Sequence, residues 1–334
     1  MSVNHLASVS ATSPGREPAI VTRGLTRRYG SVVALDHLDL EVPTGSVFGF
    51  LGPNGAGKTT TLRLLAGLGR ATSGIAVVAG VPVGQNRPEL ARRIGYLDQD
   101  PKLYGWMRGR EVLELAGRLY GLSGVALRQR VCELLEQVGL LDAAERRVAG
   151  YSGGMRQRLG IAQAIIHRPP VVFLDEPVSA LDPEGRHDVL GLIEQLRPDT
   201  TVFMSTHILG DVERICDRVA ILDAGQVVVE GPISELLDQF ARPSYELELE
   251  PGQPAMTSRL ADALRAHAWA GSVETSGTLV QLGVRDPEAA ASGVLAVAAS
   301  TGARLIRLER RRPTLEDVFL QLVGREHRQL EGAA

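Results

Sequence analysis

The chain has 334 residues, enough for one large domain or two smaller ones, and 44% of them are hydrophobic, which is enough for a core. Its 36 basic and 39 acidic residues leave a net charge of −3, which excludes a general electrostatic attraction to nucleic acid or anionic lipid. Two cysteines, Cys132 and Cys216, are too few for a disulfide framework, and no apolar stretch approaches the roughly 20 residues of a membrane span.

The first predicted elements are a tail and a phosphate-binding loop. Residues 1–18 lack the apolar core of a signal peptide, so we expect a flexible tail. Ser46 to Leu51 is typical of a short buried strand, and Thr60 to Leu65 is typical of the start of a helix. Between them, residues 52–59 read Gly-Pro-Asn-Gly-Ala-Gly-Lys-Thr, a complete G-x-x-x-x-G-K-[ST] loop.

Each residue type in this loop suits the binding of a nucleoside triphosphate. Glycines let successive backbone N–H groups approach an anion, and the following helix adds its positive N-terminal end. Only Lys58 and Lys102 are lysines, so a lysine in this loop indicates that a compact ammonium is needed there. We expect Lys58 to reach the β- and γ-phosphates and the Thr59 hydroxyl to ligate Mg²⁺. The predicted nucleotide-binding set is Gly52, Pro53, Asn54, Gly55, Ala56, Gly57, Lys58, Thr59 and Thr60.

From Ala19 to about Phe240, strand-like runs alternate with helical patterns, which predicts one α/β domain with a sheet covered by helices. Between about Gly95 and Gly150 the pattern turns helical. Arg110–Tyr120 and Leu127–Val138 carry apolar residues at i, i+3 and i+4, which predicts a helical insertion.

Two further segments carry groups that can act on a bound phosphate. The apolar run from Val171 to Leu174 ends in Asp175 and Glu176. A buried strand can hold Asp175 beside the phosphate loop, where it would bind Mg²⁺, and Glu176 could polarise the attacking water as a general base. Ser152-Gly153-Gly154 precedes a predicted helix, Met155–His167, and offers free N–H groups at a second helix N-terminus.

The C-terminal part predicts a separate small domain. Residues 241–244 (Ala-Arg-Pro-Ser) have the composition of a linker, and Tyr245 to Glu250 alternates as a half-buried strand does. The order strand, helix, two strands, helix, strand predicts an α+β domain of ferredoxin-like type over residues 245–323. A capping box at Thr314 to Asp317 opens its final helix, and residues 324–334 form a tail.

The order of phosphate loop, Ser-Gly-Gly element, Asp-Glu strand and a following His207 resembles the ATP-binding cassette (ABC) ATPases over about Ala19 to Phe240. The resemblance implies a RecA-like core with antiparallel β and helical subdomains. It also gives roles to further residues, although Tyr151 stands where the family commonly has Leu. The roles are Tyr29 for stacking on adenine; Ser152, Gly153 and Gly154 for the signature motif; Asp182 for the loop that crosses the dimer interface; Glu176, His207 and Gln99 for catalysis; and Thr59, Gln99 and Asp175 for Mg²⁺.

Two segments, Arg110–Leu113 and Ser205–Leu209, resemble the drug- and lipid-export ATPases of this family. The segment Pro313–Phe319 more specifically resembles the end of type-two exporter ATPases, such as those of the daunorubicin-resistance type. The resemblance implies ATP and Mg²⁺ as cofactors, a head-to-tail dimer with a second copy, and a separate integral membrane permease that contacts the helical insertion. We expect the ATPase subunit of an exporter of drugs, lipids or other amphipathic compounds. It would lie at the cytoplasmic face of the membrane, held there by the permease, with no nucleic acid partner.

Other classes of protein share parts of this pattern. Soluble ABC ATPases that act on ribosomes commonly carry two cassettes, whereas this chain has one phosphate loop. Those that act on DNA insert long coiled coils, for which Lys58 and Ser152 lie too close together. A binding module without hydrolysis is disfavoured by Lys58, Asp175 and Glu176, and a solute importer by the C-terminal segment.

Overall fold

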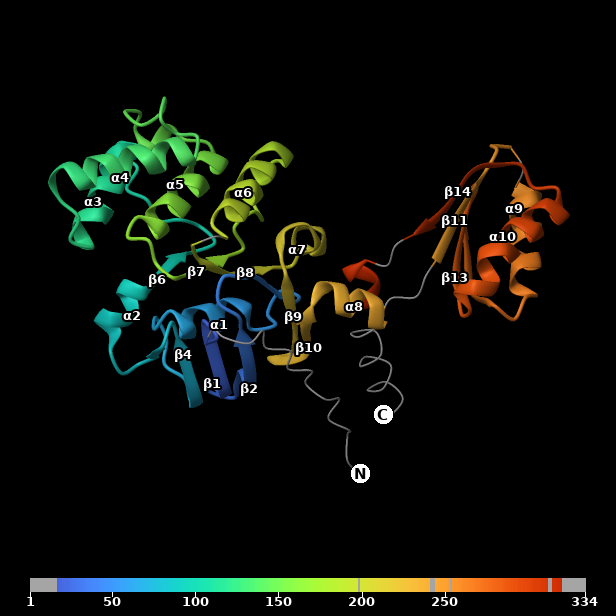
Figure 1. Cartoon of the computed structure of the whole chain (residues 1–334), viewed down its shortest axis with the longest axis horizontal. Helices are drawn as coiled ribbons and strands as arrows, with labels where there is room; N and C mark the ends of the chain where they lie inside the picture. Colours follow the sequence, from blue (N-terminus) through green and yellow to red (C-terminus); the bar gives the residue numbers. More distant parts are fainter. Residues whose placement is uncertain (1–16, 198, 241–243, 253, 312–313, 320–334) are drawn as a thin grey trace. The chain divides into compact units, whose positions relative to one another are not determined.

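The computed structural model in Figure 1 describes residues 17–197, 199–240, 244–252, 254–311 and 314–319. The chain divides into two compact units, residues 1–233 and 234–334. Within these ranges, no helix combines the length and apolarity needed to cross a membrane. The predicted α/β class, with its RecA-like core, antiparallel and helical subdomains and ferredoxin-like second domain, is confirmed.

The first unit contains an antiparallel sheet in the order β2-β1-β4-β5. Its strands are β1 (Ile20–Tyr29), β2 (Val32–Val42), β4 (Ser73–Val78) and β5 (Val81–Pro82). Helix α1 (Lys58–Leu65) buries Leu62 and Leu65 in a core shared with this sheet and with Phe48 and Phe203 of the second sheet.

The second sheet of this unit has six strands in the order β10-β9-β3-β8-β7-β6. They are β3 (Val47–Leu51), β6 (Ile94–Leu97), β7 (Val171–Asp175), β8 (Thr201–Thr206), β9 (Arg218–Asp223) and β10 (Gln226–Pro232). All neighbours pair in parallel except β9 and β10. The strands β3, β7 and β8 are buried along their whole length, as expected for a parallel sheet covered on both faces. The two strands predicted for this sheet, Ser46 to Leu51 and Val171 to Leu174, are confirmed within one residue.

Helices surround this sheet and form a helical part between the phosphate loop and β7 (Figure 1). The helices before β7 are α2 (Arg87–Arg93), α3 (Gly109–Leu119), α4 (Gly124–Gln137), η1 (Val148–Gly150) and α5 (Gly153–Ile165). After β7 come α6 (Pro183–Gln195) and α7 (Leu209–Ile215). The helical pattern starts later than the predicted Gly95, because Gly95 to Leu97 belong to β6.

The parallel register decides what meets at one edge of the sheet. Leu51 pairs with Thr206, and Asp175 pairs with Ser205. The carboxyl ends of β3, β7 and β8 therefore lie side by side, and the segments that follow them share one crevice, the usual ligand position in such sheets.

The second unit contains a four-stranded antiparallel sheet in the order β12-β13-β11-β14. Its elements follow helix α8 (Ile233–Phe240) and are β11 (Ser244–Leu249), α9 (Pro254–Arg265), β12 (Ala270–Ser276), β13 (Leu279–Val284), α10 (Pro287–Thr301) and β14 (Leu305–Arg311). The order strand-helix-strand-strand-helix-strand is that of a ferredoxin-like fold. One face of the sheet packs its alternating Tyr245, Leu247 and Leu249 against α9 and α10.

The ends of the second unit lie only partly within the described residues. Of the predicted linker 241–244, only Ser244 is described, and it already belongs to β11. Residues 315–319 are helical, and the predicted capping box is confirmed. The Thr314 hydroxyl accepts from the Asp317 N–H at 3.3 Å, and the Asp317 carboxylate accepts from the Thr314 N–H at 2.9 Å. The predicted continuation of this helix to 323 and the tails at residues 1–16 and 324–334 fall outside the described ranges.

Candidate nucleotide-binding site

The loop between β3 and α1 contains two positions where only glycine fits. At Gly52 a Cβ atom would lie 2.3 Å from the carbonyl oxygen of Leu222. At Gly57, the N-cap of α1, the backbone has a φ of 111°, and a Cβ atom would lie 2.5 Å from the carbonyl oxygen of Ala34. At these two positions the loop is pressed against its neighbours, so a side chain would not fit.

Lys58, the first residue of α1, folds its side chain back into the loop. Its Nζ donates to the carbonyl oxygens of Gly52 at 2.7 Å and Pro53 at 3.2 Å. The same Nζ lies 3.4 Å from Oε1 of Glu176, and both side chains are almost fully buried. The ammonium is thus held by oxygen acceptors that a phosphate oxygen can replace.

Asp175, the last residue of β7, is held by two hydroxyl groups. Its Oδ1 accepts from Ser205 Oγ at 2.6 Å and from Thr59 Oγ1 at 3.1 Å. Burial raises the pKa of Asp175, although these two hydrogen bonds act against the rise. Among the described residues, the buried Oδ2 has no hydrogen-bond partner. A buried carboxylate oxygen without a donor, beside a threonine hydroxyl, fits the oxygen ligands that Mg²⁺ prefers.

Glu176 follows the strand in an unusual backbone conformation. Its φ is 46°, which non-glycine residues adopt only where the surroundings hold them. Its N–H donates to the hydroxyl and carbonyl oxygens of Ser205, at 3.0 and 3.2 Å. The turn directs the carboxylate into the cavity, where Oε2 lies 2.9 Å from Nδ1 of His207.

These groups open into one cavity of about 250 Å³. Its lining residues are Ala34, Asn54, Gly55, Gly57, Lys58, Thr59, Thr60, Gln99, Glu176 and His207. The structure therefore brings together the phosphate loop, Gln99, Glu176 and His207, while Asp175 lies directly behind Thr59. Gln99 follows β6, and its N–H donates to Oδ1 of Asp98 at 3.0 Å.

Three groups of predicted residues lie outside the lining of this cavity. Tyr29 ends β1, is 53% exposed, and carries the guanidinium of Arg27 over one face of its ring, 4.3 Å from the centroid. Ser152 caps α5, where its hydroxyl accepts from the Met155 N–H at 3.2 Å. Asp182 caps α6 in the same way, accepting from the Gly185 N–H at 3.2 Å.

Ser152, Gly153 and Asp182 are all exposed to solvent. None of these three residues lines the cavity that contains the phosphate loop.

Ser205 is the site residue that the sequence interpretation missed. It contacts both carboxylate-bearing residues, yet serine is common in strands and carries no signal of its own. Its position two residues before His207 in an apolar strand is the only hint in the sequence.

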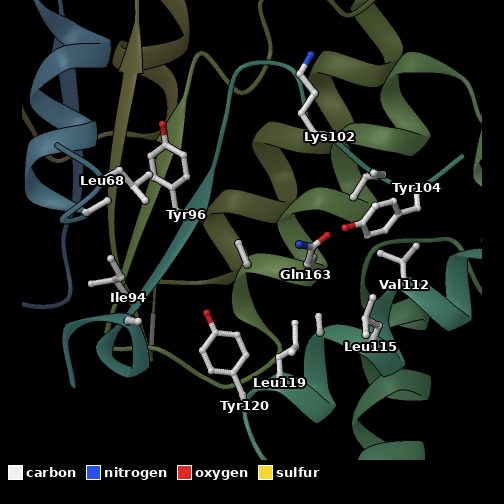
Figure 2. A pocket seen from close by; sticks show the side chains of 15 residues that line it. Leu68, Ile94, Tyr96, Lys102, Tyr104, Val112, Leu115, Leu119, Tyr120 and Gln163 are labelled. Atoms are coloured by element: carbon white, nitrogen blue, oxygen red, sulfur yellow. The ribbon is translucent and has the colours of Figure 1, made fainter. Parts of the chain in front are cut away.

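A second, larger cavity of about 460 Å³ lies between the sheet and the helical part. Figure 2 shows Leu68, Ile94 and Tyr96 on the sheet side, and Tyr104, Leu115, Leu119 and Tyr120 on the helical side. Leu119 is 78% exposed, and nearby Trp106, whose ring centroid lies 5.9 Å from that of Tyr104, is 71% exposed. A monomer rarely leaves so many large apolar side chains together in water, and we call this cavity, with its exposed apolar lining, the groove.

Comparison with known proteins identifies relatives over both units. Residues 35–179 match the ABC transporter family, and residues 231–323 match the C-terminal domain of DrrA1-3-like ATP-binding proteins. The daunorubicin resistance ATP-binding protein DrrA3 of Streptomyces coeruleorubidus is 40% identical over 319 residues, which cover 95% of this chain and 99% of that protein. The Nod factor export ATP-binding protein I of Cupriavidus metallidurans is 37% identical over 311 residues, 92% of this chain and 97% of that protein.

Solved structures of ABC transporter subunits are also similar to this chain. An ATP binding subunit of an ABC transporter is 30% identical with a TM-score of 0.61, covering 66% of this chain and 93% of that chain. A bacterial ABC transporter cassette solved as a dimer is 27% identical with a TM-score of 0.59, covering 64% of this chain and 98% of that chain.

Proposed function

Because the chain belongs to the ABC transporter ATP-binding proteins, we propose that it hydrolyses ATP to drive a membrane exporter of drugs, lipids or other amphipathic compounds. The observation that carries the proposal is that residues of the phosphate loop, Glu176 and His207 line the same cavity, the one of about 250 Å³. The printed names of the relatives, a daunorubicin resistance protein and a Nod factor export protein, support export of amphipathic compounds.

The proposed chemistry assigns one task to each side chain. Residues 52–60 hold the phosphates, and Lys58 exchanges its carbonyl acceptors for β- and γ-phosphate oxygens. Glu176 accepts a proton from the attacking water. His207, hydrogen-bonded to Glu176, orients that carboxylate and contacts the γ-phosphate. Tyr29 offers its free ring face to adenine.

Mg²⁺ is proposed to bind at Asp175, Thr59 and Gln99. Asp175 would offer the unpaired Oδ2, Thr59 its hydroxyl and Gln99, which also lines the cavity, its side-chain carbonyl. When bound there, the ion would neutralise charge on the β- and γ-phosphate oxygens.

The second half of each ATP site is proposed to come from another copy of the chain. Ser152 and Gly153 are exposed at the start of α5, where a helix N-terminus can bind an anion. A head-to-tail dimer would place them against the partner's phosphate loop, with Asp182 at the crossing between the two chains. ATP would then hold the dimer together, and hydrolysis would release it.

The permease is proposed to dock in the groove of Figure 2, through short amphipathic cytoplasmic helices. The chain would then be peripheral, at the cytoplasmic face of the membrane. Leu119→Glu should abolish co-purification of the permease and leave ATP binding intact. Val125→Glu is the matched control, because Val125 is also exposed but lies outside the lining of the groove.

Two experiments test the proposal as a whole. Lys58→Ala should lose ATP binding, measured by calorimetry, while Arg92→Ala on the exposed side of α2 should not. Unchanged affinity in Lys58→Ala would refute the phosphate-loop assignment. A tagged chain purified from gently solubilised membranes should carry a multi-span membrane protein in near-equal amount. Ribosomal or DNA-associated proteins in its place would support a soluble ABC ATPase.

A further inference from the structure

The hydroxyl group of Ser205 bridges the two carboxylate-bearing residues of the site. It donates to Oδ1 of Asp175 at 2.6 Å and accepts from the backbone N–H of Glu176 at 3.0 Å. Ser205 is fully buried on β8, directly opposite Asp175 in the parallel register. One side chain therefore contacts two residues to which the proposed function gives different tasks.

For Asp175, the bridge fixes the orientation of the carboxylate. The terminal torsion of an aspartate is broad and has no sharp preference of its own. Donation from Ser205 and Thr59 to the same oxygen, Oδ1, removes that freedom. It also leaves Oδ2 as the oxygen without a donor among the described residues.

For Glu176, the bridge supports a backbone conformation that the residue would otherwise avoid. The two acceptors recorded for its N–H both belong to Ser205. With a φ of 46°, the chain turns sharply after β7, and this turn brings the carboxylate to Lys58 and His207.

We propose that Ser205 is a positioning residue for both carboxylates: it keeps Oδ2 of Asp175 free for Mg²⁺ and holds the turn that aims Glu176 into the cavity. The proposal rests on the proposed function for the roles of Asp175 and Glu176. A residue that orients a metal ligand commonly changes metal affinity by about 10- to 100-fold when it is lost.

The test compares Ser205→Ala, Ser205→Cys and the control Thr201→Val in the full chain. Thr201 lies at the other end of β8, is equally buried, and also accepts a backbone N–H, that of Gly45, at 2.9 Å. ATP affinity is measured by calorimetry in EDTA and then over a series of Mg²⁺ concentrations, and the hydrolysis rate is measured separately.

In EDTA, Ser205→Ala should bind ATP no more weakly than the parent, because the loop is untouched and any release of the Glu176 carboxylate from Lys58 would favour the phosphate. The Mg²⁺ concentration that half-saturates the Mg²⁺-dependent gain in ATP affinity should rise on the order of 10-fold, and kcat should fall with it. Ser205→Cys should resemble Ser205→Ala, because a thiol fills the space but is a weak donor. Thr201→Val should match the parent in both measurements.

Parental Mg²⁺ dependence in Ser205→Ala overturns the inference. Full recovery in Ser205→Cys, or an equal loss in Thr201→Val, also overturns it, because either result points to packing or general destabilisation. If the parent chain neither binds nor hydrolyses ATP, both the proposed function and the inference are refuted. If the parent binds and hydrolyses ATP and only the predicted differences between the variants are missing, the inference alone is refuted.

Discussion

Glu176→Gln is expected to strengthen ATP binding as well as stop hydrolysis. The Glu176 carboxylate lies 3.4 Å from Lys58 Nζ and 2.9 Å from His207 Nδ1. The carboxylate partly neutralises the positive charge of Lys58 that a γ-phosphate would otherwise contact. Its own negative charge would also repel that phosphate. The amide keeps the size of the side chain and removes its charge.

The expected gain in ATP affinity can be estimated from the distance between Lys58 Nζ and Glu176 Oε1. Two unit charges 3.4 Å apart, as Lys58 Nζ and Glu176 Oε1 are, interact by about 5 kcal/mol at an effective dielectric constant of about 20. Both side chains are almost fully buried, so desolvation offsets most of this attraction. If about 1–2 kcal/mol remains, loss of the charge should improve ATP affinity about 5- to 30-fold.

The assay is calorimetric titration with ATP in EDTA, so that hydrolysis does not interfere. Glu194→Gln, an exposed change on α6 outside the cavity, is the charge-matched control and should leave the affinity unchanged. Affinity in Glu176→Gln that equals or falls below that of the parent would show that the carboxylate does not compete with phosphate for Lys58.

Three further changes test other parts of the structure. Arg27→Ala removes the guanidinium that lies 4.3 Å from the centroid of the Tyr29 ring. The change should raise KM for ATP by about 2- to 5-fold at unchanged kcat, because Arg27 holds the ring in place. An equal fall in kcat would contradict that role. Tyr151→Phe breaks the 2.7 Å hydrogen bond to the Ala143 carbonyl and should cost about 1 kcal/mol in chemical denaturation, and a neutral result would mean that water replaces the phenol. Burial raises the pKa of Glu230 from 4.5 to about 7, so the folded chain binds an extra proton in that range and loses stability as the pH rises through it. Thermal denaturation of Glu230→Gln should lack this loss, and parallel pH profiles would refute the shift.

Much of the fold could be read from local patterns. The strict alternation of Tyr245 to Leu249 and the order of elements after it predicted the ferredoxin-like unit, because periodicity of 2 and 3.6 is a property of neighbouring residues. The same reasoning misplaced the start of the helical part at Gly95. A strand of four residues such as β6 shows too few repeats to be told from a helix start.

The sequence by itself determined the phosphate loop, because the residues that would bind phosphate, 52–60, are consecutive and can be recognised without knowing any contact between distant parts of the chain. It also determined that Asp175 and Glu176 end a buried strand. Only the tertiary structure decided that Asp175 contacts Thr59, that Glu176 lies beside Lys58, and that Ser205 contacts both of these acidic residues. Those contacts depend on the parallel register of β3, β8 and β7, strands separated by many residues in the chain and aligned only by hydrogen bonding and burial in the folded sheet.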